Sequence, residues 1–116
     1  MHVVVHEDPG YLTVEVEGQY SLEEALQVIE RVRVEADRRS CRRVLFDVIG
    51  VSGRSLPTER FRMGLEASAV WGRQLRVAVL STVADFSLYT EDVAVGHGAQ
   101  FRSCADKGVA IRWLLQ

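Results

Sequence analysis

Cysteine is scarce in this sequence, and its two copies are not grouped with other metal ligands. Cys41 and Cys104 lie far apart in the chain, without a C-x-x-C pair or a neighbouring cluster of cysteine and histidine. Isolated cysteines of this kind give no sign of a zinc or redox site. We expect two reduced, largely buried thiols and no cofactor.

Long apolar runs are absent as well. No segment approaches the roughly 18 consecutive apolar residues that are needed to span a bilayer. The opening residues, MHVVVHEDPG, contain neither a basic leader nor a long apolar segment. These absences predict a soluble, cytoplasmic protein that makes no membrane contact.

An excess of charge of one sign is also lacking. The 14 basic and 16 acidic residues give a formal net charge of -2, and the arginines are scattered over several segments. No overall field favours nucleic acid, so a nucleic-acid partner is not expected. A length of 116 residues with 47% hydrophobic residues suits one packed core, and we predict a single domain over residues 1–116.

What the sequence does contain is a strongly apolar central segment, residues 42–58. A nearly continuous apolar run predicts a strand over residues 43–49 that is covered on both faces, as in a parallel sheet between helices. Asp47 is the one charge inside that run. Gly50, Ser52, Gly53 and Ser55 then predict a flexible polar turn, at the strand end where open α/β sheets place their ligand sites.

Turn and capping residues divide the rest of the chain. Pro9 and Gly10 predict a hairpin between strands at 2–6 and 11–17, and Ser21 forms a capping box with Glu24. The remaining predictions are helices at 21–39, 57–72, 85–95 and from 106 onward, with Asp85 and Asp106 as N-caps, and strands at 75–80 and 99–104. The order β-β-α-β-α-β-α-β-α predicts an α/β fold with a mixed, largely parallel sheet flanked by helices.

Apolar spacing also predicts which helix faces point inward. In the second helix the predicted inner residues are Phe61, Gly64, Leu65, Ser68 and Ala69, with Gly64 and Ser68 allowing a close approach to the sheet. In the last helix they are Val109, Ala110, Trp113 and Leu114. The arginines at 38, 39, 42 and 43 lie beside the C-terminus of the first helix, where the helix dipole favours cations.

Together these patterns resemble the STAS-like domains related to the bacterial anti-sigma-factor antagonists of the SpoIIAA type, in a divergent branch. The resemblance covers nearly the whole chain and rests on residues 11–18 (YLTVEVEG), the helix from Ser21, and residues 43–47 (RVLFD), 59–64 (ERFRMG), 75–79 (LRVAV) and 110–114 (AIRWL). These are mostly core patterns, so they speak for fold more than for function. The resemblance implies a noncatalytic regulatory or protein-interaction module with a protein partner, and a homodimer is an open alternative.

One motif of that family is altered here. In its regulated members, a strand that ends in Asp leads to an Asp-Ser-Ser-Gly at the start of the next helix, and the first serine is phosphorylated. Asp47 matches the Asp at the strand end, but Ser55-Leu56-Pro57-Thr58 stands where Asp-Ser-Ser-Gly is expected. This departure predicts a module without the usual phosphoserine motif.

A serine hydrolase is disfavoured by the sequence. Ser52 or Ser55 with His97 and Asp47 would supply the residue types of a nucleophilic triad, but no G-x-S-x-G motif is present. No catalytic residue is therefore predicted.

A metal site is disfavoured too. His2 and His6 fall on one strand face, and Glu15 or Glu17 could lie across the hairpin. Surface or half-buried histidines explain this pattern better than metal ligands do.

The binding hypothesis concerns the end of the central strand and the start of the second helix. The candidate residues for a partner or an anionic group are Asp47, Ser52, Arg54, Ser55 and Thr58. In a plainer alternative, Ser55 only caps the helix and Arg54 is solvated. A domain that holds a small anionic or apolar molecule at residues 50–57 is the alternative function.

Overall fold

The structure of the protein is a computed structural model that describes residues 1–82 and 84–116, and for residues 84–89 it describes the backbone only. The predicted order of elements is confirmed. The strands are β1 (His2–Asp8), β2 (Tyr11–Gln19), β3 (Arg43–Ser52), β4 (Arg76–Leu80) and β5 (Gln100–Cys104). The helices are α1 (Leu22–Arg38), α2 (Pro57–Trp71), α3 (Ala84–Gly96) and α4 (Lys107–Leu114). None of the helices in the described residues is both long enough and apolar enough to cross a membrane.

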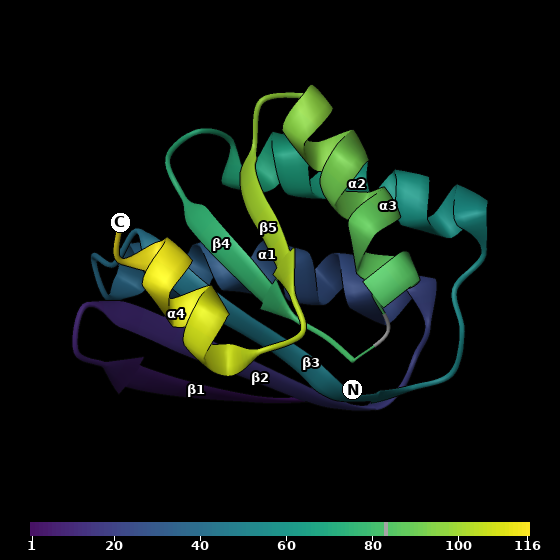
Figure 1. Ribbon diagram of the computed structural model, residues 1–116. Helices are drawn as coiled ribbons and strands as arrows, with labels where there is room; N and C mark the ends of the chain where they lie inside the picture. Colours follow the sequence, from purple (N-terminus) through teal and green to yellow (C-terminus); the bar gives the residue numbers. More distant parts are fainter. Residues whose placement is uncertain (83) are drawn as a thin grey trace.

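The strands form one mixed sheet in the order β1-β2-β3-β4-β5 (Figure 1). β1 and β2 make the antiparallel hairpin that Pro9 and Gly10 predict, and every later neighbour pairs in parallel. β3 lies in the middle of the sheet, as its apolar run predicts. The carboxyl ends of β2 to β5 therefore meet at one edge of the sheet.

Helices cover both faces of this sheet, which gives the molecule two cores. Side chains that alternate along the strands supply the larger core, under α1, α2 and α3, and the smaller one, under α4. Phe46 points into the larger core and Leu45 into the smaller one. The fold is thus the predicted single layer of sheet between helices.

Trp71 is the centre of the larger core. Its ring is 1% exposed, stacks on Phe101 at 5.7 Å and meets the edge of Phe46 at 6.1 Å between centroids. Its indole Nε1–H donates to the carbonyl of Ile29 at 2.9 Å, so the one polar atom of the ring is satisfied. This residue ties α1, α2 and the sheet together.

The central strand is longer than predicted, because β2 also continues and supplies a pairing partner. Gly50, Val51 and Ser52 pair with Glu17, Gly18 and Gln19, so the turn expected at residue 50 begins only at Gly53. Between the pairs Glu15–Asp47 and Glu17–Gly50, β3 has one residue more than β2. This bulge reverses the alternation, and for that reason Val48 and Val51 both pack against the larger core.

The inner face of α2 was predicted wrongly. Its buried residues are Met63, Gly64, Ala67 and Trp71, whereas Phe61 is 44% exposed and Ala69 is also exposed. Gly64 does mark a close approach, but to α3 rather than to the sheet. A Cβ on Gly64 would lie 2.7 Å from Cβ of Val93 and 3.0 Å from the carbonyl oxygen of Thr90.

The helix ends follow the predicted caps where the structure describes them. Ser21 Oγ accepts from the N–H of Glu24 at 3.2 Å, and Asp106 Oδ1 accepts from the N–H of Val109 at 2.9 Å. Helix α3 begins at Ala84, and the side chain of Asp85, its predicted cap, lies outside the described residues. On α4, Ala110 and Leu114 are buried as predicted, but Val109 is 43% exposed because it points away from the sheet.

Candidate functional site

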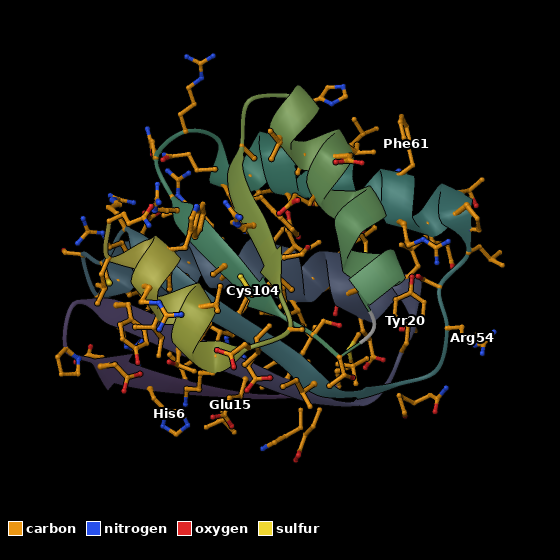
Figure 2. All side chains as sticks on the ribbon, viewed as in Figure 1. His6, Glu15, Tyr20, Arg54, Phe61 and Cys104 are labelled. Atoms are coloured by element: carbon orange, nitrogen blue, oxygen red, sulfur yellow. The ribbon has the colours of Figure 1, made fainter. Side chains whose placement is uncertain are left out.

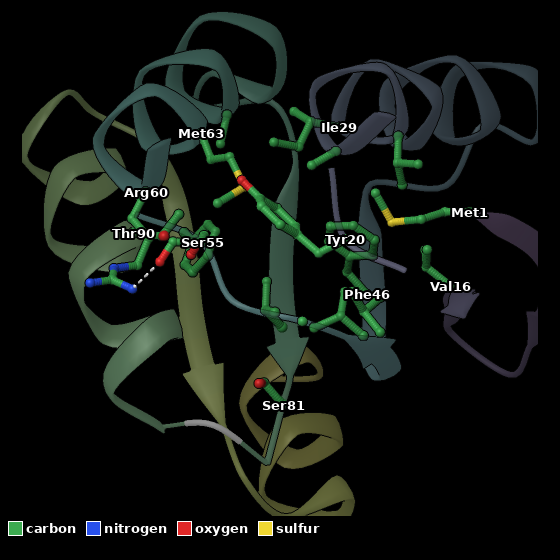
Figure 3. A pocket seen from close by; sticks show the side chains of 18 of the residues that line it. Met1, Val16, Tyr20, Ile29, Phe46, Ser55, Arg60, Met63, Ser81 and Thr90 are labelled. Carbon is green, nitrogen blue, oxygen red and sulfur yellow. Dashed lines mark hydrogen bonds between the residues drawn. The ribbon is translucent and has the colours of Figure 1, made fainter. Parts of the chain in front are cut away.

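A largely apolar cavity of about 780 Å³ lies between the sheet and helices α1, α2 and α3 (Figure 3). Its size is within the range of about 300–1,000 Å³ typical of ligand pockets. The apolar part of its wall is formed by Met1, Val16, Ala25, Val28, Ile29, Phe46, Val48, Val51, Met63, Ala67, Trp71, Val79 and Phe101. The strand residues in this wall all project from the face that carries the larger core.

The cavity reaches the surface beside the connection from β3 to α2. Gly53 and Arg54, which are exposed, lie at its margin, whereas Trp71 and Ala67 at the inner end are almost closed to water. The open part is therefore the part near Tyr20 and the β3–α2 connection. This position at the carboxyl end of the strands is where open α/β sheets place their ligands.

Polar side chains are few in the wall. They are Tyr20, Arg54, Ser55, Arg60, Ser81 and Thr90. Arg60 is partly buried, and its Nη1–H donates to the carbonyl oxygen of Ser55 at 3.0 Å (dashed in Figure 3). The guanidinium of Arg60 places a positive charge beside an apolar cavity.

Ser55 is the most unusual of these residues. It is 6% exposed, and its Oγ has no hydrogen-bond partner within the part of the chain that the structure describes. Buried hydroxyl groups in native proteins almost always have a partner, because leaving one unsatisfied costs about 1–3 kcal/mol. The Oγ of Ser55 therefore has an unused donor and unused acceptor positions in the cavity wall.

Tyr20 lies at the end of β2 and closes the cavity from the side of the hairpin (Figure 3). Burial raises the pKa of its hydroxyl from 10.0 to about 12, with the negative charge of Glu59 and a hydrogen bond to that carboxylate adding to the effect. The positive charge of Arg60 acts in the opposite direction. Tyr20, Glu59 and Arg60 thus form one polar group at the opening.

The structure distributes the five candidate binding residues over different surroundings. Ser55 lies in the cavity wall and Arg54 at its margin, while Ser52 and Thr58 are exposed. Ser52 Oγ donates to the carbonyl of Gly18 at 3.3 Å. Asp47 follows the alternation of Leu45, away from the cavity, and its Oδ1 accepts from the N–H of Ile49 at 3.0 Å within the bulge.

Ser55 does not cap α2, contrary to the plainer alternative. The N-cap is Leu56, whose N–H donates to Oε1 of Glu59 at 2.8 Å. The acidic side chain of the first turn thus already satisfies a backbone donor that an anion would use. Ser55 is left free for another role.

The residue types of a hydrolase triad are not brought together. Ser52 and Ser55 lie at the carboxyl edge of the sheet, whereas His97 follows the C-terminus of α3, just before β5 starts at the opposite edge. There its Nδ1 is 2.8 Å from the carbonyl oxygen of Val93. The structure therefore does not place His97 next to Ser52 or Ser55.

The histidines and cysteines have ordinary environments. His6 and Glu15 approach to 3.6 Å across the hairpin with both side chains half exposed (Figure 2), and no group of three potential metal ligands occurs among the described residues. Neither cysteine forms a disulfide, and Cys41 is only partly buried. Burial raises the pKa of the Cys104 thiol, which keeps it in its less reactive form.

The arginines near the end of α1 are engaged in ion pairs within the chain. Glu35 is 3% exposed and is paired with Arg31, Arg38 and Arg39, and Arg42 binds Asp37 at 2.6 Å. These pairs agree with a structural role for the arginines at the end of α1.

Sequence reasoning did not identify Tyr20, Arg60 or the cavity. Arg60 stands one helical turn before Gly64 and Tyr20 directly after a strand, and neither belongs to a motif. One signal was available: Arg60 lies at helical spacing from Met63 and Ala67, so the three residues share one face of α2. That face could be recognised only after the inner side of α2 was known.

Comparisons with known proteins agree with this architecture. No protein-family model and no curated protein matches the sequence. Among solved structures, an anti-sigma factor antagonist from Mycobacterium paratuberculosis is similar over 99% of this chain and 94% of its own, with a TM-score of 0.69 and 12% identity. An uncharacterised protein of the DUF3478 family with a SpoIIAA-like fold, from Shewanella loihica PV-4, is similar over 97% of this chain and 92% of its own, with a TM-score of 0.58 and 20% identity. The chain therefore has the STAS-like, SpoIIAA-type fold that its sequence predicts.

Proposed function

We propose that this domain is a noncatalytic regulatory module that binds a protein partner through the surface at the start of α2. The fold is that of an anti-sigma factor antagonist, which is the first support. The carrying observation is that Leu56 and Phe61, two large apolar residues at this end of α2, are 63% and 44% exposed, and that the exposed Arg54 precedes Leu56 by two residues. Apolar side chains rimmed by charge are typical of interaction sites.

Arg54 and Phe61 both project outward from this end of the molecule (Figure 2). Ser52 and Thr58 add exposed hydroxyl groups on either side of Arg54. A partner with a carboxylate group and an apolar patch would match this surface. Ser55, the only serine at the altered family motif, is closed to a kinase by its burial, so the proposed module works without phosphorylation at that position.

The test compares two charge-reversal variants, one in the connection from β3 to α2 and one at the start of β3. Arg54→Glu is expected to weaken binding of a partner captured on the immobilised chain by roughly tenfold or more, since it replaces an attractive contact with a repulsive one. Arg43→Glu reverses the charge of an exposed residue at the opposite end of β3 and should leave binding unchanged. Equal affinities for the two variants would show that the partner binds elsewhere.

A second candidate function is a small-ligand domain, and the cavity beside residues 53–55 is the observation that favours it. Native mass spectrometry of the purified protein tests it directly. A bound molecule that is released on unfolding would support this function, and apoprotein alone from several expression hosts would speak against it.

A further inference from the structure

We propose that the cavity binds a small amphipathic acid, with its apolar part between the sheet and helices α1 and α2, and its single carboxylate at Arg60 and Ser55. This inference rests on the second candidate function and names the class of its ligand. It is independent of the protein surface around Arg54 and Leu56.

The apolar part of the proposed ligand is inferred from the apolar lining of the cavity. Thirteen of the twenty lining residues are apolar, and the partly buried ones nearest the opening include Val48, Val51 and Ala25. Each methylene group that leaves water for such a wall contributes about 0.8 kcal/mol. A molecule without an apolar body would gain little here.

The acidic head follows from the two polar groups that face it. Arg60 binds the carbonyl oxygen of Ser55 through Nη1, and a guanidinium has five N–H donors, so it can bind a carboxylate at the same time. The buried Oγ of Ser55 can donate its hydrogen to the second carboxylate oxygen. This hydroxyl has no hydrogen-bond partner among the described residues.

The head should carry one negative charge and no more. Among the residues whose side chains the structure describes, Arg60 is the one cation that is both partly buried and in the cavity wall, since Arg54 is exposed at its margin. Glu59 lies close enough to Tyr20 to raise the pKa of that residue, so a negative charge is already present at the opening. A dianionic phosphate or a dicarboxylate would bring an uncompensated charge into a partly desolvated site.

The two tryptophans provide a local reporter. Trp71 lines the cavity, whereas Trp113 lies on α4 in the other layer, where the Arg76 guanidinium carbon is 4.0 Å from its ring centroid. In Trp113→Phe, which keeps an aromatic ring for Arg76, Trp71 is the only tryptophan left. Emission from this variant therefore reports on the cavity alone.

The experiment titrates Trp113→Phe with dodecanoate below its micellar concentration, and with dodecanol as the neutral counterpart. A saturable change in Trp71 emission is expected with dodecanoate and a much weaker affinity with dodecanol. Arg60→Gln should weaken dodecanoate binding roughly 10- to 100-fold, as expected for a charge-assisted hydrogen bond. The matched control Arg62→Gln, in the same helix but exposed and outside the cavity wall, should not change it.

Each outcome decides the proposal. Equal affinities for dodecanoate and dodecanol, both unaffected by Arg60→Gln, would overturn the acidic head while leaving a small-ligand domain in place. Saturation with neither compound would overturn the ligand site as a whole, and the proposed protein partner would be untouched. If Arg60→Gln does not fold, Ser55→Ala replaces it: it should fold normally and weaken dodecanoate binding about 2- to 10-fold, and an unchanged affinity would contradict the placement of the carboxylate.

Discussion

The ionisation of Tyr20, at the cavity opening, is coupled to folding. The folded protein holds the pKa of Tyr20 at about 12, whereas a model tyrosine has 10.0, because burial and the carboxylate of Glu59 both disfavour the phenolate. A raised pKa in the folded state means that the folded chain retains a proton that the unfolded chain has lost. Stability from this source is complete below pH 10 and is lost as the pH rises toward 12.

We therefore predict that the free energy of unfolding falls between pH 10 and pH 12, and that Tyr20→Phe removes the part of this fall that Tyr20 causes. Urea denaturation of both proteins across this pH range measures the effect. Tyr11→Phe, in the smaller core, is the control. Identical pH dependence in Tyr20→Phe and the wild type would show that the phenolate forms without cost.

Several residue environments could not have been derived from the sequence. Ser55 reads as a helix cap by type and position, yet Glu59 takes the N–H of Leu56 and Ser55 turns into the cavity. Glu35 is buried among three arginines, although no local pattern in the sequence marks it for burial. Such outcomes depend on contacts between distant elements, which local patterns do not contain.

At the scale of elements, the position of α2 against α3 depends on Gly64. A Cβ at this residue would lie 2.7 Å from Cβ of Val93, which belongs to the opposite helix and cannot move without the whole helix. Gly64→Ala should therefore destabilise the protein by about 1–2 kcal/mol, because overpacking costs more than the gain in helix propensity of up to 1 kcal/mol.

Thermal or urea denaturation measures this change, with Gly96→Ala as the matched control. Gly96 is likewise a helical glycine, the last residue of α3, but a Cβ there meets no atom within 4 Å, so Ala should be neutral or slightly stabilising. If Gly64→Ala were as stable as Gly96→Ala, the two helices would not be packed as closely as described.

The strands were predictable from the sequence because their apolar patterns are local. The inner face of α2 was not predictable in this way. Two stripes at helical spacing exist in that segment: one with Phe61, Leu65 and Ala69, and one with Met63, Ala67 and Trp71. Periodicity alone cannot choose between them. Trp71 determines which stripe is buried, because its ring packs on Phe46 and Phe101 of the sheet and its Nε1–H donates to a carbonyl oxygen of α1.

At the scale of the whole molecule, stability depends on the central strand between the two cores. Phe46 is 8% exposed in the larger core, while Ile49 on the same strand is 46% exposed. We predict that Phe46→Asp unfolds the domain, because a buried unpaired charge costs several kcal/mol out of a total stability of roughly 5–15 kcal/mol. Ile49→Asp, an equal change of chemistry at an exposed site, should retain a cooperative transition.

Circular dichroism with temperature compares the two variants. A near-native melting transition of Phe46→Asp, or unfolding of both variants, would contradict the assignment of the core.

At the same scale, the fold was easier to predict from the sequence than the candidate site. Apolar periodicity, caps and turns were enough to predict a mixed sheet between helices, since those signals concern the core, and the SpoIIAA type of this fold came from the family resemblance. Arg54 and Ser55 were predicted as binding residues from their place after the central strand, whereas the cavity and the exposed side chains of Leu56 and Phe61 emerged only from the three-dimensional arrangement.

The most direct test of the proposed function is amide hydrogen–deuterium exchange of the domain, alone and with its captured protein partner. The account predicts slower exchange on binding in residues 53–61, which contain Arg54, Leu56 and Phe61, with little change in α4 and in the β1–β2 turn on the other side of the molecule. Protection confined to α4 or to the hairpin, with residues 53–61 unchanged, would contradict it.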